Sequence, residues 1–273
     1  MKKRFLSATV FLPAIVILSI AGNYFFLFLI AFTAFVAAYE CNKILQKRNT
    51  ADLPLLSGAF SVILVALIYF FVSISSYTNV IATTILISSV ASMIWMLFYL
   101  ESTPRLIRDM ASLLAPAVYT GGILSLTIIL RETSHGLIII FYLIALTSAA
   151  DTGAYVIGKF VGKTPFFPGI SPSKTWEGST AAMLCAIGAS VLFAITTSKT
   201  NIVNISMTHS ILVGISIGFA GQIGDLYESS LKRKSRVKDS GALIPGHGGI
   251  LDRIDSVIFN IPVIYYSMQW LIE

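Results

Sequence analysis

Charged residues are scarce in this 273-residue chain, where Asp, Glu, Lys and Arg together make up 12%. A typical soluble domain has about 25%. Hydrophobic residues account for 56%, and the mean hydropathy is +0.83. A soluble globule of this size would lack the polar residues needed to cover its surface. The composition therefore excludes a cytosolic domain and a disordered chain, and it predicts a polytopic membrane protein.

Cysteine is nearly absent, with only Cys41 and Cys185 in the chain. Two cysteines are too few for a disulfide framework, which excludes a disulfide-stapled secreted module. Cys185 lies inside an apolar run and is expected to be a small buried side chain. Low-complexity tracts are missing too, and no repeat with a period of about 20–50 residues indicates a solenoid.

Apolar runs long enough to cross a bilayer, about 20 residues each, fill most of the chain. Residues 5–39 are free of charge and contain Gly22-Asn23, which predicts a tight hairpin of two short spans. A cleaved signal peptide is the alternative for the first of them. Seven further spans are predicted at 55–75, 80–100, 110–130, 137–156, 178–197, 206–223 and 254–272. The sequence thus predicts an all-α protein with about nine transmembrane helices.

The positive charges are divided unequally between the two sides that nine spans define. Seventeen of the nineteen Lys and Arg residues lie on the side of the N-terminus, and only Arg131 and Lys199 lie on the other. Because cytoplasmic loops are enriched in Lys and Arg, the N-terminus and the long loops are predicted to be cytoplasmic. The net charge of +6 then reflects topology, and no nucleic-acid partner is expected.

Polarity inside the apolar pattern is concentrated in the second half of the chain. Residues 1–148 are interpreted as a scaffold of about five spans, and residues 149–273 as a catalytic region of about four. Two cytoplasmic stretches, 150–178 and 224–255, interrupt the catalytic region. The connectors at 40–54 and 101–109 are expected to be surface loops or short interfacial helices.

Acidic residues at the ends of apolar runs indicate a site, because a charge within a span is costly unless it faces a wet cavity or a partner. Asp151 follows one such run, and Asp225 ends another. Asp252 opens the next span, so that both ends of the basic loop between Asp225 and Asp252 can reach one depth. Two carboxylates with room for water and substrate phosphates suit magnesium. For Glu228 and Asp255, ordinary ion pairs at the membrane interface are an equal alternative.

Basic side chains and glycines surround these two carboxylates. Lys232, Arg233, Lys238 and Arg253 lie between or beside them, and residues 245–249 read Pro-Gly-His-Gly-Gly. Cationic side chains and exposed backbone N–H groups are what polyphosphates bind. His247, flanked by glycines, is expected to contact a phosphate. The glycines at 153–164 do not form a P-loop, because their spacing or the residue after the lysine is wrong and no soluble strand precedes them.

Residues 229–255 resemble the signature of the phosphatidate cytidylyltransferases, also called CDP-diacylglycerol synthases. The matching elements, at the family's spacing, are Ser229, 231–233, 238–241, 244–249 and 252–255. Upstream, the similar positions are Asp151, 154–155, 158–159, 162–163, 171–175 and 177–178. The likeness runs from residue 149 to the C-terminus, while the first half is similar in hydropathy and span count.

The resemblance implies a multi-pass membrane enzyme, homodimeric, that joins CTP to phosphatidic acid and releases pyrophosphate. It implies a cytoplasm-facing site, with magnesium held by Asp225 and Asp252 and a second cation as an open alternative. The residues expected to act on the reacting phosphates are Lys232, Arg233, Lys238, Asp239, His247 and Arg253. The residues expected to bind substrate are Asp151, Lys159, Lys163, Ser171, Lys174, Glu177, Gly248 and Gly249.

Other classes of membrane protein share parts of this pattern. A secondary transporter also has intramembrane acids and glycine-interrupted helices, but here the acids gather at one cytoplasmic level. Another CTP-dependent lipid-phosphate enzyme, such as a lipid-alcohol kinase, is a second alternative. The aspartate-rich signature of the CDP-alcohol phosphotransferases is absent. A nucleotide-regulated scaffold without catalysis is the weakest reading.

Overall fold

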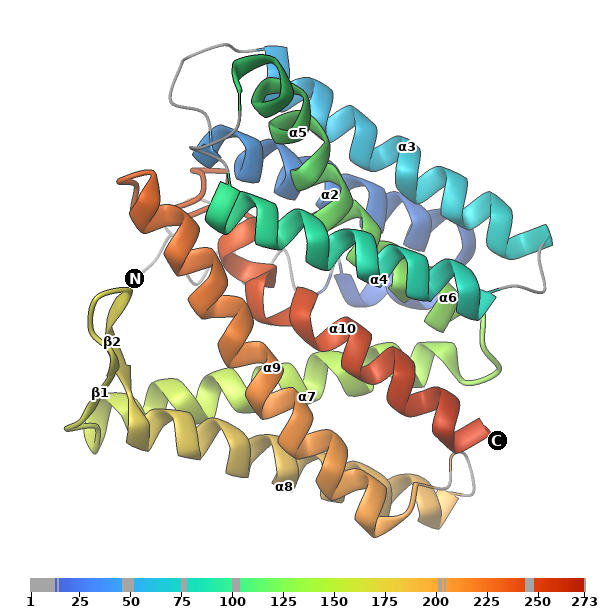
Figure 1. Cartoon of the computed structure of the whole chain (residues 1–273). Coiled ribbons are helices and arrows are strands. Elements are labelled where there is room, and N and C mark those ends of the chain that lie inside the picture. Colours follow the sequence, from blue (N-terminus) through green and yellow to red (C-terminus); the bar gives the residue numbers. More distant parts are fainter. Residues whose placement is uncertain are drawn as a thin grey trace. The chain divides into compact units, whose positions relative to one another are not determined.

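The computed structural model describes residues 13, 15–45, 52–74, 78–99, 104–200, 203, 205–243 and 248–272. Helices dominate this part of the chain, accompanied by one small two-stranded sheet (Figure 1). The elements before the sheet are α2 (Asn23–Leu45), α3 (Asp52–Ile74), α4 (Thr78–Ile94), η1 (Trp95–Tyr99), α5 (Arg105–Ala117), η2 (Val118–Gly122), α6 (Ile123–Arg131) and α7 (Gly136–Phe160). The sheet and the helices after it are β1 (Pro165–Phe167), β2 (Ser171–Thr175), α8 (Trp176–Thr200), α9 (Met207–Lys234) and α10 (Leu251–Ile272).

Within the described residues, seven helical segments are long and apolar enough to cross a membrane. They are Asn23–Leu45, Leu53–Val72, Thr78–Tyr99, Ile107–Arg131, Gly136–Phe160, Trp176–Thr200 and Met207–Lys234. The prediction of an all-α polytopic membrane protein is confirmed. The count of nine spans and the cytoplasmic N-terminus stay predictions: α10 is not among the seven, and much of the first predicted span lies outside the described residues.

The expected break in the first apolar stretch lies at Gly22. Residues 15–21 are helical, and α2 begins at Asn23. Gly22 has φ 66° and Asn23 has φ 42°. This left-handed region costs glycine little, and asparagine tolerates it better than most other residues. The Gly-Asn pair therefore ends one helix and starts the next, as predicted.

The chain forms two compact units that do not follow its order in sequence. Unit 1 comprises Met1–Ile129 and Ser230–Ile254, and unit 2 comprises Leu130–Ser229 and Asp255–Glu273. Helices α6, α9 and α10 each contribute residues to both units. The predicted division at 148/149 separates scaffold from catalytic region by function, and it stays a prediction.

In unit 1, small residues let the π-helical turn η2 approach its neighbours closely. A methyl group on Gly121 would come 3.0 Å from Ser61 Cβ, and one on Gly122 would come 3.0 Å from Ser89 Oγ. Such contacts are typical of helix packing in membranes. The Ser89 hydroxyl donates to the Val118 carbonyl over 3.0 Å. A polar side chain thus satisfies a backbone group in the irregular turn.

The expectation of a surface connector at residues 40–54 is wrong at its beginning. Helix α2 continues through Leu45, and Glu40, Cys41 and Asn42 are buried. Asn42 donates through Nδ2 to the Ser112 carbonyl on α5 over 2.6 Å. These polar residues remain helical because unit 1 provides their hydrogen-bond partners. The segment at 46–51 lies outside the described residues.

In unit 2, α7 and α8 lie side by side and are joined by the β1–β2 hairpin, which was not predicted (Figure 1). A buried hydrogen bond of 2.5 Å links Tyr142 of α7 to Ser190 of α8, and Asn260 Nδ2 of α10 donates to Thr147 Oγ1 of α7 over 2.9 Å. Cys41 and Cys185 are both free, but Cys185 is exposed and not buried. Its neighbours in sequence are apolar because the outer face of a membrane helix is apolar.

Candidate functional site

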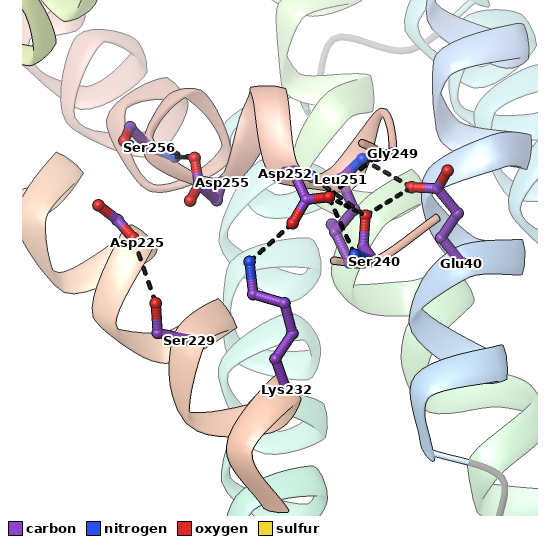
Figure 2. A network of polar contacts seen from close by, with 10 residues as sticks. All are labelled: Glu40, Asp225, Ser229, Lys232, Ser240, Gly249, Leu251, Asp252, Asp255 and Ser256. Atoms are coloured by element: carbon purple, nitrogen blue, oxygen red, sulfur yellow. Dashed lines mark hydrogen bonds and ion pairs between the residues drawn. The ribbon is translucent and has the colours of Figure 1, made fainter. Parts of the chain in front are cut away.

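The carboxylate of Asp252, in the first turn of α10, is the centre of a polar network in unit 1 (Figure 2). Its Oδ1 forms an ion pair with Lys232 Nζ at 2.7 Å, and the two side chains are 8% and 14% exposed. Its Oδ2 accepts the backbone N–H groups of Ser240 and Gly249, each over 2.9 Å. The Ser240 hydroxyl also lies 2.9 Å from Oδ2. Both oxygens of Asp252 are therefore engaged by donors.

The hydrogen bonds at Asp252 decide its ionisation. Asp252 precedes the apolar stretch of α10, and its burial opposes the charged form. The bonds from Lys232 and from the Gly249 and Ser240 amides outweigh that burial and lower the pKa of Asp252 to about 2. The Asp252 carboxyl is therefore ionised at neutral pH.

Glu40 joins this network from α2, two hundred positions earlier in the chain (Figure 2). Its side chain is buried, and its Oε2 accepts the Ser240 hydroxyl and the Leu251 amide, each over 2.9 Å. Reasoning from the sequence missed Glu40 and gave Ser240 no role of its own. The one available signal was an acid placed directly after a long neutral run, which sequence alone cannot pair with a distant loop.

The start of α10 is capped by these same groups. The first amides of a helix have no partner within the helix. Leu251 N–H donates to Glu40, and Asp252 N–H donates to the Ser240 hydroxyl oxygen over 3.3 Å. Gly248 precedes this start with φ +84°, and a methyl group there would come 2.7 Å from Asp252 Oδ2. The glycines at 248 and 249 thus allow the backbone to lie directly against the carboxylates.

The basic residues predicted to act on phosphates belong to the same unit. Lys232 and Arg233 were expected in a loop, but they lie in the last turn of helix α9. Arg233, Lys238, Asp239 and Arg253 are exposed. His247 lies outside the described residues. The structure therefore brings Lys232, Asp252 and Gly249 into direct contact and places four further charged side chains on the surface.

A second polar group lies in unit 2, around Asp225 of α9. Asp225 Oδ2 pairs with Lys174 Nζ of β2 at 2.7 Å, and the side chains are 41% and 21% exposed, respectively. The Ser229 hydroxyl reaches Oδ1 over a long 3.4 Å (Figure 2). Asp151 and Asp255 lie within electrostatic range of Asp225. The neighbourhood of Asp225 is thus strongly acidic.

Other predicted substrate-binding residues of unit 2 lie on α7, the hairpin and α8. Lys159 Nζ lies 5.6 Å from the ring centroid of Tyr155 and 5.7 Å from that of Phe160. Ser171 begins β2, and Lys163 is exposed in the turn before β1. Glu177 accepts the Thr164 hydroxyl over 3.1 Å and the Thr164 amide over 3.3 Å, so it ties the hairpin to α8.

The acidic residues offer the hard oxygen ligands that magnesium prefers. Within the described residues, no group of three or more His, Cys, Asp or Glu side chains converges into a preformed metal cage. Magnesium does not need one, because it often binds one or two carboxylates, several waters and substrate phosphates. The long contact at Asp225 Oδ1 leaves that atom available to a cation. Binding at Asp252 Oδ1 would require displacement of Lys232. The donor set around Asp225 therefore fits magnesium.

Comparison with known proteins identifies the class of molecule. The profile of the cytidylyltransferase family matches residues 2–271. A phosphatidate cytidylyltransferase of Bacillus subtilis (strain 168) is 32% identical over 273 residues, covering 98% of this chain and 97% of the relative. One from Staphylococcus haemolyticus (strain JCSC1435) is 33% identical over 269 residues, covering 97% of each. One from Haemophilus influenzae is 39% identical over 136 residues, covering 50% of this chain and 47% of the relative.

The chain belongs to the cytidylyltransferase family. It is a nucleotidyltransferase built as a multi-pass membrane protein. The resemblance seen in the sequence is confirmed. The individual roles of the site residues, the metal, the homodimer and the side of the membrane stay predictions.

Proposed function

We propose that this protein transfers the cytidylyl group of CTP to phosphatidate, forming CDP-diacylglycerol and pyrophosphate. The observation that carries the proposal is similarity over almost the whole chain to relatives named phosphatidate cytidylyltransferase. A phosphate oxygen of phosphatidate attacks the α-phosphorus of CTP, and the bond from that phosphorus to the bridging oxygen of pyrophosphate breaks. Phosphatidate is already ionised at neutral pH, since the second pKa of a phosphate monoester is about 6, so the attack needs no general base.

The main barrier is repulsion between two anions, and the chain's cationic residues lower it. Lys232, Arg233, Lys238 and Arg253 are proposed to neutralise the phosphates, which is the dominant mode of catalysis in such transfers. Lys159 and Lys163 are proposed to contribute from the end of α7 and the turn before β1. A planar guanidinium such as that of Arg253 can bind two phosphate oxygens at once.

Magnesium is proposed as the cofactor, with Asp225 as its better-placed ligand. When bound, it would supply positive charge to the triphosphate. Asp225 is partly exposed, and it forms an ion pair with a lysine that a divalent cation can replace. Asp252 stays a predicted ligand, but the Lys232 ammonium and the amides of Ser240 and Gly249 all donate to it, so it is an anchor for Lys232 first.

An assay with radiolabelled CTP in mixed micelles tests the proposed function. The purified protein should convert phosphatidate and CTP to labelled CDP-diacylglycerol with release of pyrophosphate. Diacylglycerol in place of phosphatidate should give no product. Phosphatidate formed from diacylglycerol and γ-labelled CTP would indicate a lipid kinase instead, and the absence of turnover with either lipid would overturn the proposal. Uptake into proteoliposomes without lipid chemistry would indicate a transporter.

The site is further proposed to face the cytoplasm, because seventeen of nineteen Lys and Arg residues lie on one predicted side. A reporter inserted in the loop at 236–238 should lie in the cytoplasm, and one fused after Glu273 should lie outside. Both reporters on one side would contradict nine spans. The implied homodimer is tested by mass measurement of the protein in detergent, where a monomer at working concentration would contradict it.

A further inference from the structure

Glu40 is a carboxylate in an unusual place for a scaffold residue. It lies on α2, within a segment apolar enough to cross the membrane, and the residue is only 3% exposed. Burying a carboxylate is unfavourable unless hydrogen bonds or opposite charges compensate. An apolar residue would fill the same volume without that penalty. The hydrogen bonds that Glu40 makes therefore indicate what it does.

Those contacts converge on both ends of the loop at 240–250, which contains several glycines and precedes α10. At the loop's beginning, the Ser240 hydroxyl bonds to Glu40 Oε2, and Gly241 packs so closely that a methyl group there would collide with Oε1. At the loop's end, Leu251 N–H donates to Oε2, and a methyl group on Gly249 would collide with the same oxygen. One carboxylate thus fixes the two ends of the loop against α2.

Ser240 connects Glu40 to the predicted catalytic residues. Its hydroxyl oxygen lies 2.9 Å from Glu40 Oε2 and 2.9 Å from Asp252 Oδ2 (Figure 2). Asp252 in turn holds Lys232 Nζ at 2.7 Å through its other oxygen. A continuous chain of polar contacts therefore leads from α2 through Ser240 and Asp252 to the lysine at the end of α9.

We propose that Glu40 is a positioning residue of the transferase, which sets the orientation of Asp252 and Lys232 through Ser240. The proposal rests on the proposed function for the role of Lys232 at the phosphates. The hydrogen bonds by which Glu40 holds the two ends of the loop are a property of the fold and do not depend on that function. Glu40 acts as a hydrogen-bond acceptor, so its shape and its oxygen matter more than its charge. The N-terminal half of the chain thereby takes part in the site as well as in the scaffold.

Four variants separate this role from simple stabilisation. Glu40→Gln keeps the shape and one acceptor oxygen, and it should retain kcat/KM within about threefold of wild type. Glu40→Ala removes the acceptor and should lower kcat/KM by about 100-fold, as expected when a reacting group is displaced by about 1 Å. Ser240→Ala should lower kcat/KM by about tenfold, by the same reasoning. In the double variant, the losses should not multiply, because both act through one chain of contacts.

Asn42→Ala is the matched control. Asn42 is buried on the same helix two positions away, but it bonds to Ser112 of α5 and not to the loop. Its loss should lower Tm, while the folded protein keeps its kcat/KM. Multiplying losses in the Glu40/Ser240 double variant would overturn the proposal. So would a Glu40→Gln variant as impaired as Glu40→Ala, or an Asn42→Ala variant with the same kinetic defect.

Hydrogen exchange gives a readout that does not depend on turnover. The amides of Gly249 and Leu251 are donors to Asp252 and Glu40. Peptides covering residues 240–251 should therefore exchange faster in Glu40→Ala, but not in Glu40→Gln or Asn42→Ala. Unchanged exchange in Glu40→Ala would show that Glu40 does not hold the loop. If the wild type makes no CDP-diacylglycerol, the proposed function fails, and the exchange data still decide whether Glu40 holds the loop.

Discussion

Asp252 in unit 1 and Asp225 in unit 2 carry the same chemical group in contrasting environments. Asp252 is 8% exposed, and both of its oxygens accept hydrogen bonds, one from a lysine and the other from two backbone amides. Asp225 is 41% exposed, and the contact of its Oδ1 with Ser229 is long, at 3.4 Å. A carboxylate whose oxygens both accept hydrogen bonds from the protein holds those groups in place. An exposed carboxylate with a replaceable partner can instead accept a ligand.

The surroundings of the two aspartates extend this contrast. Asp252 lies among donors, and its negative charge is matched by Lys232. Asp225 lies within range of the further acids Asp151 and Asp255, with Lys174 as its ion-pair partner. Excess negative charge favours a cation, and balanced charge favours a fixed structure. This contrast is the basis for the proposal that Asp252 anchors protein groups and that Asp225 binds a cation.

The largest expected effect is the loss of activity in Asp225→Asn. Removing a metal ligand should lower turnover more than about 100-fold, since even groups behind the ligands cost 10–100-fold. Tm should hardly change, because an exposed ion pair contributes at most about 1 kcal/mol. Raised magnesium should restore part of the activity in micelle assays. Exposed Glu132→Gln is the control, and full activity of Asp225→Asn at ordinary magnesium would remove Asp225 from the metal site.

The second expectation is that Asp252→Asn damages the fold as well as the activity. The amide removes the carboxylate charge that lies 2.7 Å from the Lys232 ammonium, and breaking a largely buried ion pair costs about 3 kcal/mol or more. Thermal unfolding in detergent should show a lower Tm than for Asp225→Asn. Adding Lys232→Met should recover stability but not activity. Equal Tm values for Asp252→Asn and wild type would refute the anchoring role.

A smaller effect is expected for Arg253→Lys. The change keeps the charge but loses the planar fork that can bind two phosphate oxygens. Steady-state kinetics with CTP and phosphatidate varied separately should show kcat and kcat/KM both lower by about tenfold, because the lost contact strengthens in the transition state. Lys199→Ala, on the opposite predicted side, serves as the control. Identical kinetics for both variants would mean that Arg253 only marks the cytoplasmic face.

Much of this structure follows from the sequence, because transmembrane helices are dictated by local composition. The break at Gly22 could be predicted since only the local backbone decides it. Asp225, Lys232 and Asp252 could also be singled out from the sequence as candidate site residues, because charges inside an apolar pattern require a partner or a ligand.

What could not be predicted depends on contacts between distant segments. Glu40 looked like the start of a connector, because nothing near it in sequence satisfies a buried acid. Its partners Ser240 and Leu251 come from the other end of the chain. The different environments of Asp225 and Asp252 were equally hidden, since both occupy the end of an apolar run. Tertiary hydrogen bonds distinguish the two aspartates, and the hydrophobic pattern of a sequence does not reveal such bonds.

The smallest effect concerns Gly248, whose backbone lets the loop lie against Asp252. With φ +84°, an alanine there would be strained by roughly 1–2 kcal/mol. Its methyl group would also come 2.7 Å from Asp252 Oδ2, so the carboxylate or the loop must shift. Gly248→Ala should therefore lower kcat/KM by about threefold to tenfold, with a modest drop in Tm, because Asp252 keeps its ion pair but in a displaced position. Gly188→Ala is the control: Gly188 lies within α8 with open space around it, and alanine favours the helix. If Gly248→Ala matched Gly188→Ala in both measurements, the loop would tolerate movement at Asp252, and the anchoring half of the comparison would lose its support.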